Sequence, residues 1–217
     1  MKIAIIYRGN IRGFKYEESF KTHEKLYNDL LNNNISFDTY LCTNNIEYDE
    51  ISVNKIKNLK EKYILNINDI RNDNKYIQAF SNIKFTSPGW NNNFQNNIIT
   101  YWYNNNYLYN KITDKYDKYI IMDIAHIIKE LDISLLMEND NYCSSYESNT
   151  GYNTRILIGN YELYSQIMTQ FNYIVNNRLT YRNPEAFNSN FLSKHNIKKT
   201  DKLKIYRIRF DGSKLTF

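Results

Sequence analysis

The sequence predicts a single α/β domain, residues 1–217, with a mostly parallel, twisted sheet flanked by helices. Two short apolar runs, at residues 2–7 and 119–122, have the composition of strands that are buried on both faces. Segments with apolar residues at helical spacing alternate with further strand-like segments, which is typical of α/β folds. A chain of 217 residues with 42% apolar and 24% charged residues can form one sizeable core.

The first part of the chain predicts a βαβ unit. The strand at residues 2–7 is followed by a glycine-containing turn, then by a helix over 16–31 and a second strand over 36–42. The loop after the first strand should therefore lie at the carboxyl edge of the sheet. Residues 43–75 give a weaker pattern, from which we expect a helix over 53–62 and a short strand near 63–67.

The rest of the chain continues the alternation. Pro-Gly followed by three asparagines predicts a loop over 86–95. Asn183 has the composition of a helix N-cap, with Pro184 at the first helical position and Glu185 in the first turn. The remaining expected elements are helices over 96–112 and 161–175 and strands over 119–122, 154–158 and 204–209.

The turn after the first strand is a candidate anion site, formed by Arg8, Gly9, Arg12 and Gly13. Glycines let backbone N–H groups approach an anion, and guanidinium groups match phosphate oxygens in a bidentate manner. The spacing is neither G-x-G-x-x-G nor that of a Walker loop. A solvated turn without a ligand is the alternative interpretation.

Asp123 and His126 follow the strand at 119–122 and are candidate ligands of a divalent cation. In a regular strand their odd spacing would direct them to opposite faces, so they converge only if the chain turns near Ile124. The alternative is a surface carboxylate beside an imidazole packed on the rim of the sheet.

Glu185 and the two tryptophans are weaker candidates for functional residues than the groups above. A glutamate in a first helical turn usually complements the helix dipole, although it can also face a pocket as a base. Trp90 and Trp102 are core residues more often than platforms for stacking.

The charge and the cysteines of the sequence indicate which ligands and which cellular compartment to expect. The net charge of +5 suits an anionic small ligand as well as a nucleic acid. The basic run at 194–209 is interpreted as a solvated final strand with its flanks, and a nucleic-acid site there is the alternative, although the sequence has no recognised nucleic-acid motif, so no nucleic-acid partner is expected. Cys42 and Cys143 fit no metal-ligand spacing and predict free thiols in a reducing compartment. We expect a cytoplasmic protein, since neither a membrane span nor a secretory signal is present in the sequence.

Taken in order, these segments resemble a glycosyltransferase-like family of large DNA viruses and some bacteria. That family opens with an apolar strand and a G-x-x-R turn, matched here by residues 9–12, and continues with a strand of the "DVFIHT" kind, matched by "SFDTYLCTNN" (36–45). Three later matches are "NNIITYWYNNNYLYNKI" (96–112), "YDKYIIMDIAHII" (116–128) for Y-D-Y-V-I-R-x-R-x-D-L, and "PEAFNSNFLSKHNIK" (184–198) for P-E-x-x-x-x-x-x-L-x-x-x-N-I.

The resemblance implies a nucleotide-diphospho-sugar transferase of the GT-A type that acts on a glycan or glycoprotein acceptor in viral or bacterial glycan biosynthesis, within the host cytoplasm if the protein is viral. It implies a Mn²⁺ or Mg²⁺ ion held by Asp123 and His126. The implied catalytic residues are Asp123 and Glu185, and the implied donor-binding residues are Arg8, Gly9, Arg12 and Trp102.

One departure from the family concerns the R-x-R-x-D motif. This chain has Met122, Ile124 and His126 at those three positions, so both arginines and the metal-side aspartate are replaced. A non-catalytic module that binds a nucleotide or glycan through an eroded site is therefore the alternative function.

Overall fold

The computed structural model describes residues 1–9, 14–46, 48–89, 91–124, 126–145, 152, 154–208 and 214–215. Within them, a seven-stranded sheet has the order β10-β7-β8-β5-β1-β2-β3. Strand β1 is parallel to both β2 and β5, β2 is parallel to β3, and β7 is parallel to β10, whereas β8 is antiparallel to β5 and β7. The fold is therefore α/β with a mostly parallel central sheet, as the sequence predicts.

The strands of the central sheet are β1 (Lys2–Arg8), β2 (Ser36–Asn44), β3 (Leu59–Leu65), β5 (Lys118–Asp123), β7 (Asn141–Ser144), β8 (Ile156–Gly159) and β10 (Ile197–Thr200). Two smaller sheets are formed by β6 (His126–Leu131) with β11 (Leu203–Ile208) and β12 (Lys214–Leu215), and by β4 (Ile83–Phe85) with β9 (Leu179–Tyr181). The helices are α1 (Glu17–Asn32), α2 (Glu50–Val53), α3 (Ile67–Asn72), α4 (Asn74–Asn82), α5 (Asn92–Tyr109), α6 (Ser134–Met137), α7 (Tyr161–Met168), α8 (Gln170–Asn176) and α9 (Pro184–Phe191).

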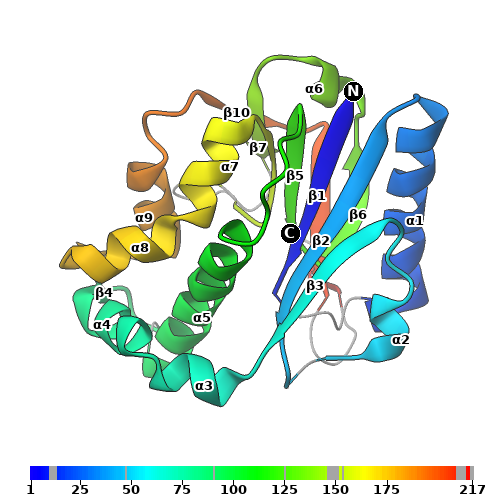
Figure 1. The fold of residues 1–217 in the computed structure, drawn as a ribbon. Helices are drawn as coiled ribbons and strands as arrows, with labels where there is room; N and C mark the ends of the chain where they lie inside the picture. The colour runs from blue at the N-terminus through cyan, green and yellow to red at the C-terminus, as the bar shows by residue number, and fades with distance from the viewer. Residues whose placement is uncertain are drawn as a thin grey trace.

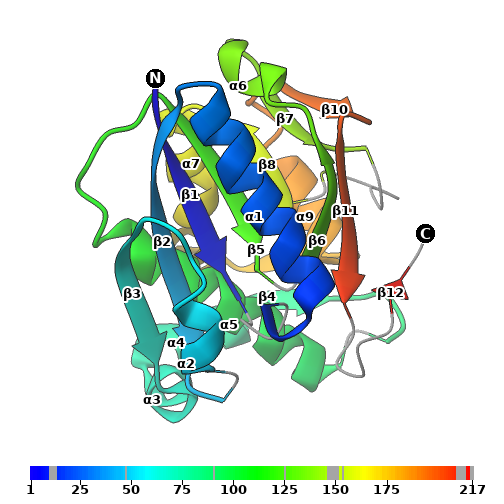
Figure 2. The ribbon, with the colours of Figure 1, turned by 90° about the vertical axis from the view of Figure 1, so that its right-hand side faces the viewer.

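Different helices pack on the two faces of the central sheet. Helix α1 packs on one face, and α5, α7, α8 and α9 lie on the opposite side (Figure 1). Turned by a quarter, the view shows α1 running across β1 and β5, with β6 and β11 beside it (Figure 2). The sheet is thus enclosed between helical layers, which explains why its central strands are apolar on both faces.

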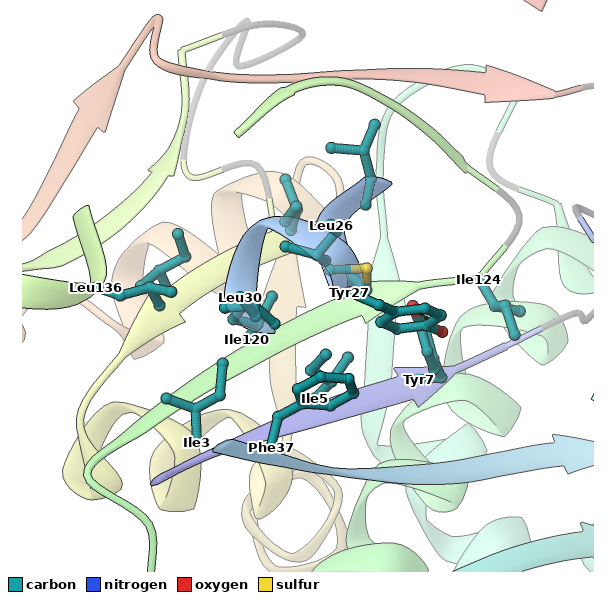
Figure 3. Packing of buried hydrophobic residues seen from close by; sticks show 14 of the residues in the cluster. Ile3, Ile5, Tyr7, Leu26, Tyr27, Leu30, Phe37, Ile120, Ile124 and Leu136 are labelled. Carbon is teal, nitrogen blue, oxygen red and sulfur yellow. Dashed lines mark hydrogen bonds between the residues drawn. The ribbon is translucent and has the colours of Figure 1, made fainter. Parts of the chain in front are cut away.

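Alternate residues of the central strands supply the two cores. Ile3, Ile5 and Tyr7 of β1 pack with Leu26, Tyr27 and Leu30 of α1 in the cluster that Figure 3 shows. Ala4 and Ile6 face the opposite cluster, which contains side chains of α5 and α7. Because the side-chain period of a strand is two, Arg8 continues the row of Ala4 and Ile6 and faces the α5 side.

The chain changes direction across the sheet between β1 and β5. From β1 it proceeds to β2 and β3 on one side, and later returns to place β5 on the other side of β1. The carboxyl ends of β1 and β5 therefore flank a topological switch point, where open α/β sheets bind their ligands.

Most strongly patterned elements are confirmed, with three corrections. The helix expected over 53–62 is wrong, because α2 ends at Val53 and the edge strand β3 begins at Leu59. The loop expected over 86–95 ends earlier, since Asn91 accepts hydrogen bonds from the N–H groups of Asn93 and Phe94 and caps α5. The helix expected over 161–175 is two helices, divided at Thr169.

The chain reverses directly after β5 in a way that the sequence pattern did not specify. Strand β5 ends at Asp123, the Ile124 N–H donates to the Arg8 carbonyl at 3.3 Å, and β6 begins at His126 in the three-stranded sheet. The turn near Ile124, which a convergence of Asp123 and His126 would require, is therefore present.

Candidate active site at the ends of strands β1 and β5

The centre of the candidate site is the ion pair between Arg8 and Asp123. The two residues are partners in the register of β1 and β5, and Arg8 Nε lies 3.4 Å from Asp123 Oδ1. Asp123 alternates with Ile121 of the α5-side core, so both side chains face the same helical layer. The prediction that Arg8 and Asp123 share one edge of the sheet is confirmed.

Helix α5 supplies a phenol and an amide to this pair. The Tyr101 hydroxyl donates to Asp123 Oδ1 at 2.8 Å, and the Arg8 guanidinium lies over the Tyr101 ring at 4.5 Å from its centroid. With its amide oxygen turned toward Arg8, Asn105 accepts from Nη1 at 3.1 Å. Tyr101 and Asn105 are four residues apart and thus project from one face of the helix.

The electrostatics of the site are reflected in the Tyr101 phenol. Burial raises its pKa well above the ordinary value, and the neighbouring Asp123 carboxylate raises it further, while the charges of Arg8 and Arg155 oppose this rise. Tyr101 therefore keeps its proton at neutral pH and remains a hydrogen-bond donor to Asp123.

Arg155 pairs with Asp123 from the β8 side of the site. Its carbonyl accepts from the Asp123 N–H at 2.9 Å, which extends the antiparallel pairing of β5 with β8 by one residue pair. Arg155 is two residues before Leu157, which belongs to the α5-side core, so its side chain is directed to the same face as that of Asp123. Arg155 is partly exposed.

The residue before Arg155 is held from two directions. Arg8 Nη2 donates to the Thr154 carbonyl, and the Asn188 amide donates to the Thr154 hydroxyl at 3.1 Å. Asn188 in turn accepts from the Gln170 amide at 2.9 Å. A hydrogen-bonded series thus connects β1 with α9 and α8 and fixes the backbone at the start of β8.

Arg8 itself offers little surface to a ligand. Its side chain is 1% exposed, whereas that of Asp123 is 19% exposed. Buried and paired, Arg8 serves to position Asp123 and the Thr154 backbone. The expected direct contact of Arg8 with a diphosphate is not supported by this burial.

Gly9 follows Arg8 in the left-handed region, at φ +83°, which a glycine adopts without strain. A Cβ atom there would lie 4.0 Å from the Tyr101 ring, so the backbone conformation, and not crowding, accounts for glycine at this position. Arg12, Gly13 and Trp90 lie outside the described residues.

Two side chains of helix α1 bind the backbone carbonyl of His126. His23 Nε2 donates to the His126 carbonyl at 3.0 Å, and the Ser19 hydroxyl donates to the same oxygen at 3.2 Å. On its other side, His23 Nδ1 accepts from the Tyr7 hydroxyl at 2.7 Å. Burial lowers the pKa of His23 to about 4, so this anchor is neutral at physiological pH.

The expected divalent-metal site does not fit these residues. The His126 ring is buried, and its Nδ1 donates to the Asp123 carbonyl at 3.3 Å. The Asp123 carboxylate accepts from Tyr101 and pairs with Arg8, and Arg155 adds a second positive charge nearby. No group of three or more His, Cys, Asp or Glu side chains that could hold a metal occurs in the described part of the chain. Mg²⁺ and Mn²⁺ prefer carboxylate oxygens, so we derive no step through a metal.

Trp102 and Glu185, which were also predicted as site residues, have different positions relative to the Arg8–Asp123 pair. Trp102 is 2% exposed and packs edge-on against Phe187 in the core, so its burial does not support the expected contact with the donor. Glu185 is partly exposed in the first turn of α9, where Asn183 is confirmed as the N-cap. It lies one helical turn before Asn188 on the same side of the helix, near the site but without a described contact to it.

Sequence interpretation missed four members of this cluster, namely Tyr101, Asn105, Arg155 and Asn188. The sequence of α5 did contain one indication of the site. Asn105 is a polar residue on the same helix face as Leu108, and that face is otherwise apolar. Arg155 could have been found by alternation in "RILIG", once that segment is assigned beside β5.

A scan against models of protein families finds no match, and a search of curated proteins finds no significant match. Mouse xyloside xylosyltransferase 1 in its apo form aligns over 92% of this chain and 85% of its own, with 9% identity and a TM-score of 0.45. An active-site mutant of LgtC aligns over 92% and 72%, with 12% identity and a TM-score of 0.48. The galactosyltransferase LgtC in complex with donor and acceptor sugar analogues aligns over 88% and 70%, with 11% identity and a TM-score of 0.42. Because these TM-scores are below 0.5, the likenesses do not decide the function of this chain.

Proposed function

We propose that this protein transfers a sugar from a nucleotide-diphosphate donor to a hydroxyl group of a glycan or glycoprotein. The observation that carries the proposal is the pairing of Arg8 with Asp123 at the topological switch point of the sheet. Ligands of open α/β sheets bind outside the carboxyl ends of the strands at such a point. Asp123 ends β5 at this edge and belongs to the segment 116–128, one of those that resemble GT-A-type transferases.

In the proposed reaction, the acceptor hydroxyl oxygen forms a bond to the anomeric carbon of the sugar. The bond between that carbon and the diphosphate oxygen breaks, and its electron pair leaves with the nucleoside diphosphate. The hydroxyl proton passes to a base, for which Glu185 is our candidate. Since negative charge accumulates on the leaving diphosphate, preorganised positive groups at the site would lower the barrier.

Asp123 has the accessible carboxylate of the site and is assigned to the donor. An ionised carboxylate only accepts hydrogen bonds, so Asp123 would bind hydroxyl groups of the ribose or of the transferred sugar. Tyr101 and Arg8 fix its orientation through the contacts described above. The carboxylate is thus held in one position before a ligand arrives, which favours tight binding.

The test is a thermal-shift screen of the purified protein with UDP-, GDP-, CDP- and dTDP-sugars, followed by measurement of donor hydrolysis. We expect one nucleotide class to raise the melting temperature and to release its nucleoside diphosphate. Nucleoside monophosphates are the control and should stabilise the protein less. Failure of every nucleotide sugar to stabilise the protein would overturn the proposal.

A non-catalytic module that binds a nucleotide or glycan is the second candidate. The observation in its favour is the set of residues at the site, in which Asp123 lies between Arg8 and Arg155 in the register of the sheet and no group of three or more possible metal ligands is found among the described residues. It predicts stabilisation by a nucleotide or glycan without hydrolysis or transfer, with or without Mn²⁺.

A further inference from the structure

Asp123 lies between two arginines in the register of the sheet, Arg8 on β1 and Arg155 just before β8, and their side chains differ in accessibility. Arg8 is buried behind the carboxylate and is engaged by Tyr101 and the Thr154 carbonyl. Arg155 approaches from the β8 side and is partly exposed. The positive charge of Arg8 therefore offsets the negative charge of Asp123 inside the protein. The positive charge of Arg155 is located where a ligand can reach it.

The position of Arg155 is fixed by its backbone. Its carbonyl is bound by the Asp123 N–H, and the preceding Thr154 is held by Arg8 and by Asn188. These contacts come from β5, β1 and α9, three elements that are far apart in the sequence. A residue held in this manner can present its side chain to a ligand with little loss of backbone entropy.

We propose that Arg155 binds the diphosphate of the donor directly, and that the two arginines supply the positive charge at this site in place of a divalent cation. This inference rests on the proposed function. The planar guanidinium fork matches two phosphate oxygens in a bidentate manner. Two arginines and one aspartate leave a net positive charge, which attracts an anion and disfavours a cation.

The test is isothermal titration calorimetry with inorganic pyrophosphate and with the nucleoside diphosphate of the stabilising class, each in EDTA and in Mn²⁺. We compare the wild-type protein with Arg155→Ala and Arg155→Lys. The matched control is Arg178→Ala, which removes the same charge at an exposed position between α8 and β9. Circular dichroism and the melting temperature verify that each variant is folded.

We expect Arg155→Ala to weaken the binding of both anions roughly 10- to 100-fold, the effect of losing a hydrogen bond between charged groups. Arg155→Lys should recover part of the affinity, because it keeps the charge without the fork. Arg178→Ala should bind within about twofold of the wild type, and EDTA should leave the wild-type affinity unchanged.

Two results separate this inference from the proposed function. Nucleoside diphosphate affinity that is equal in the wild type and Arg155→Ala, or that requires Mn²⁺, overturns the role of Arg155 and leaves the donor class intact. Pyrophosphate binding that depends on Arg155, without binding of any nucleotide sugar, supports an anion site at Arg155 and overturns glycosyl transfer. Binding of neither anion overturns both.

Discussion

The Tyr101 hydroxyl donates a hydrogen bond to Asp123 Oδ1 at 2.8 Å and thereby joins helix α5 to the end of strand β5. The same ring lies against the guanidinium of Arg8, so one side chain contacts both members of the central ion pair. Tyr101 is therefore a positioning residue, since it acts on a ligand through Asp123 and Arg8.

Tyr101→Phe should retain the ring but lose the hydrogen bond to Asp123. We expect the free energy of unfolding to fall by roughly 1–2 kcal/mol, because a buried hydrogen bond to a charged group is lost. Donor turnover should fall about tenfold or more, while the contact of the ring with Arg8 is retained. Chemical denaturation and steady-state kinetics measure the two effects.

Tyr103→Phe is the matched control for that variant. It removes a hydroxyl from the same helix, but this hydroxyl donates to Asp73 at 3.1 Å, away from the ion pair. Turnover by Tyr103→Phe should equal that of the wild type. Equal turnover by both variants would exclude a positioning role for Tyr101.

Asp123→Asn should destabilise the protein as well as impair donor binding. The substitution leaves the buried Arg8 without its carboxylate, and loss of one partner of a buried ion pair costs roughly 3–5 kcal/mol, reduced here because Asp123 is 19% exposed. Denaturant unfolding should show a loss of about 2 kcal/mol or more. Asp117→Asn, at an exposed position just before β5, is the control and should lose much less, because the amide oxygen can still accept from the Lys2 N–H.

A double-mutant cycle tests the ion pair independently of any ligand. If Arg8 and Asp123 stabilise each other, the losses from Arg8→Met and Asp123→Asn should not add, and their coupling should exceed about 1 kcal/mol. Additive losses would show that the two side chains contribute separately.

Glu185→Gln tests the proposed base. Proton transfer by a positioned side chain contributes roughly 10²- to 10⁴-fold to a rate, so transfer to the acceptor should fall at least about 100-fold. Nucleoside diphosphate affinity should be unchanged, because the substitution is isosteric and the residue does not belong to the Asp123 cluster. Glu162→Gln removes a carboxylate from the first turn of α7 and is the control. A normal transfer rate in Glu185→Gln would return Glu185 to the role of a helix-dipole complement.

The fold was predictable where local patterns are strong. The buried runs of β1 and β5, the βαβ order and the N-cap at Asn183 all determined their elements, and together they placed Arg8 and Asp123 at one edge. Edge strand β3 was expected only near 63–67, and its first residues were assigned to a helix, because its side chains alternate between partly exposed and exposed positions and give no apolar run. Its assignment depends on pairing with β2, a long-range contact that composition does not encode.

The site was predictable only in part, since its composition depends on tertiary contacts. The sequence indicated basic residues after β1, but not that Arg8 would be buried beneath Tyr101 and engaged by Thr154. Arg155 reaches the site because β8 is antiparallel to β5. The spacing of Asp123 and His126 suggested a shared ligand, whereas the chain reversal directs the His126 ring to the Asp123 backbone.

The final prediction concerns pH and the buried His23. Its pKa is lowered to about 4 chiefly by burial, against an ordinary value of 6.5. The unfolded chain therefore binds a proton at this position more readily than the folded protein, and stability falls as the pH decreases from about 6.5 toward about 4. Between pH 7 and pH 5 the contribution of His23 should be a loss of roughly 2 kcal/mol.

His23→Gln isolates this contribution, because glutamine does not titrate and can still donate to the His126 carbonyl, the acceptor of His23 Nε2. Burial also lowers the pKa of His195, but that residue is present in both proteins and cancels in the difference. Denaturant unfolding at pH 7 and pH 5 should show a smaller loss for the variant than for the wild type, by about 2 kcal/mol. Carboxylates with lowered pKa values titrate mainly below this window and should not obscure the difference. Identical pH dependence in the two proteins would show that folding does not lower the pKa of His23 and would contradict a buried, neutral imidazole at this position.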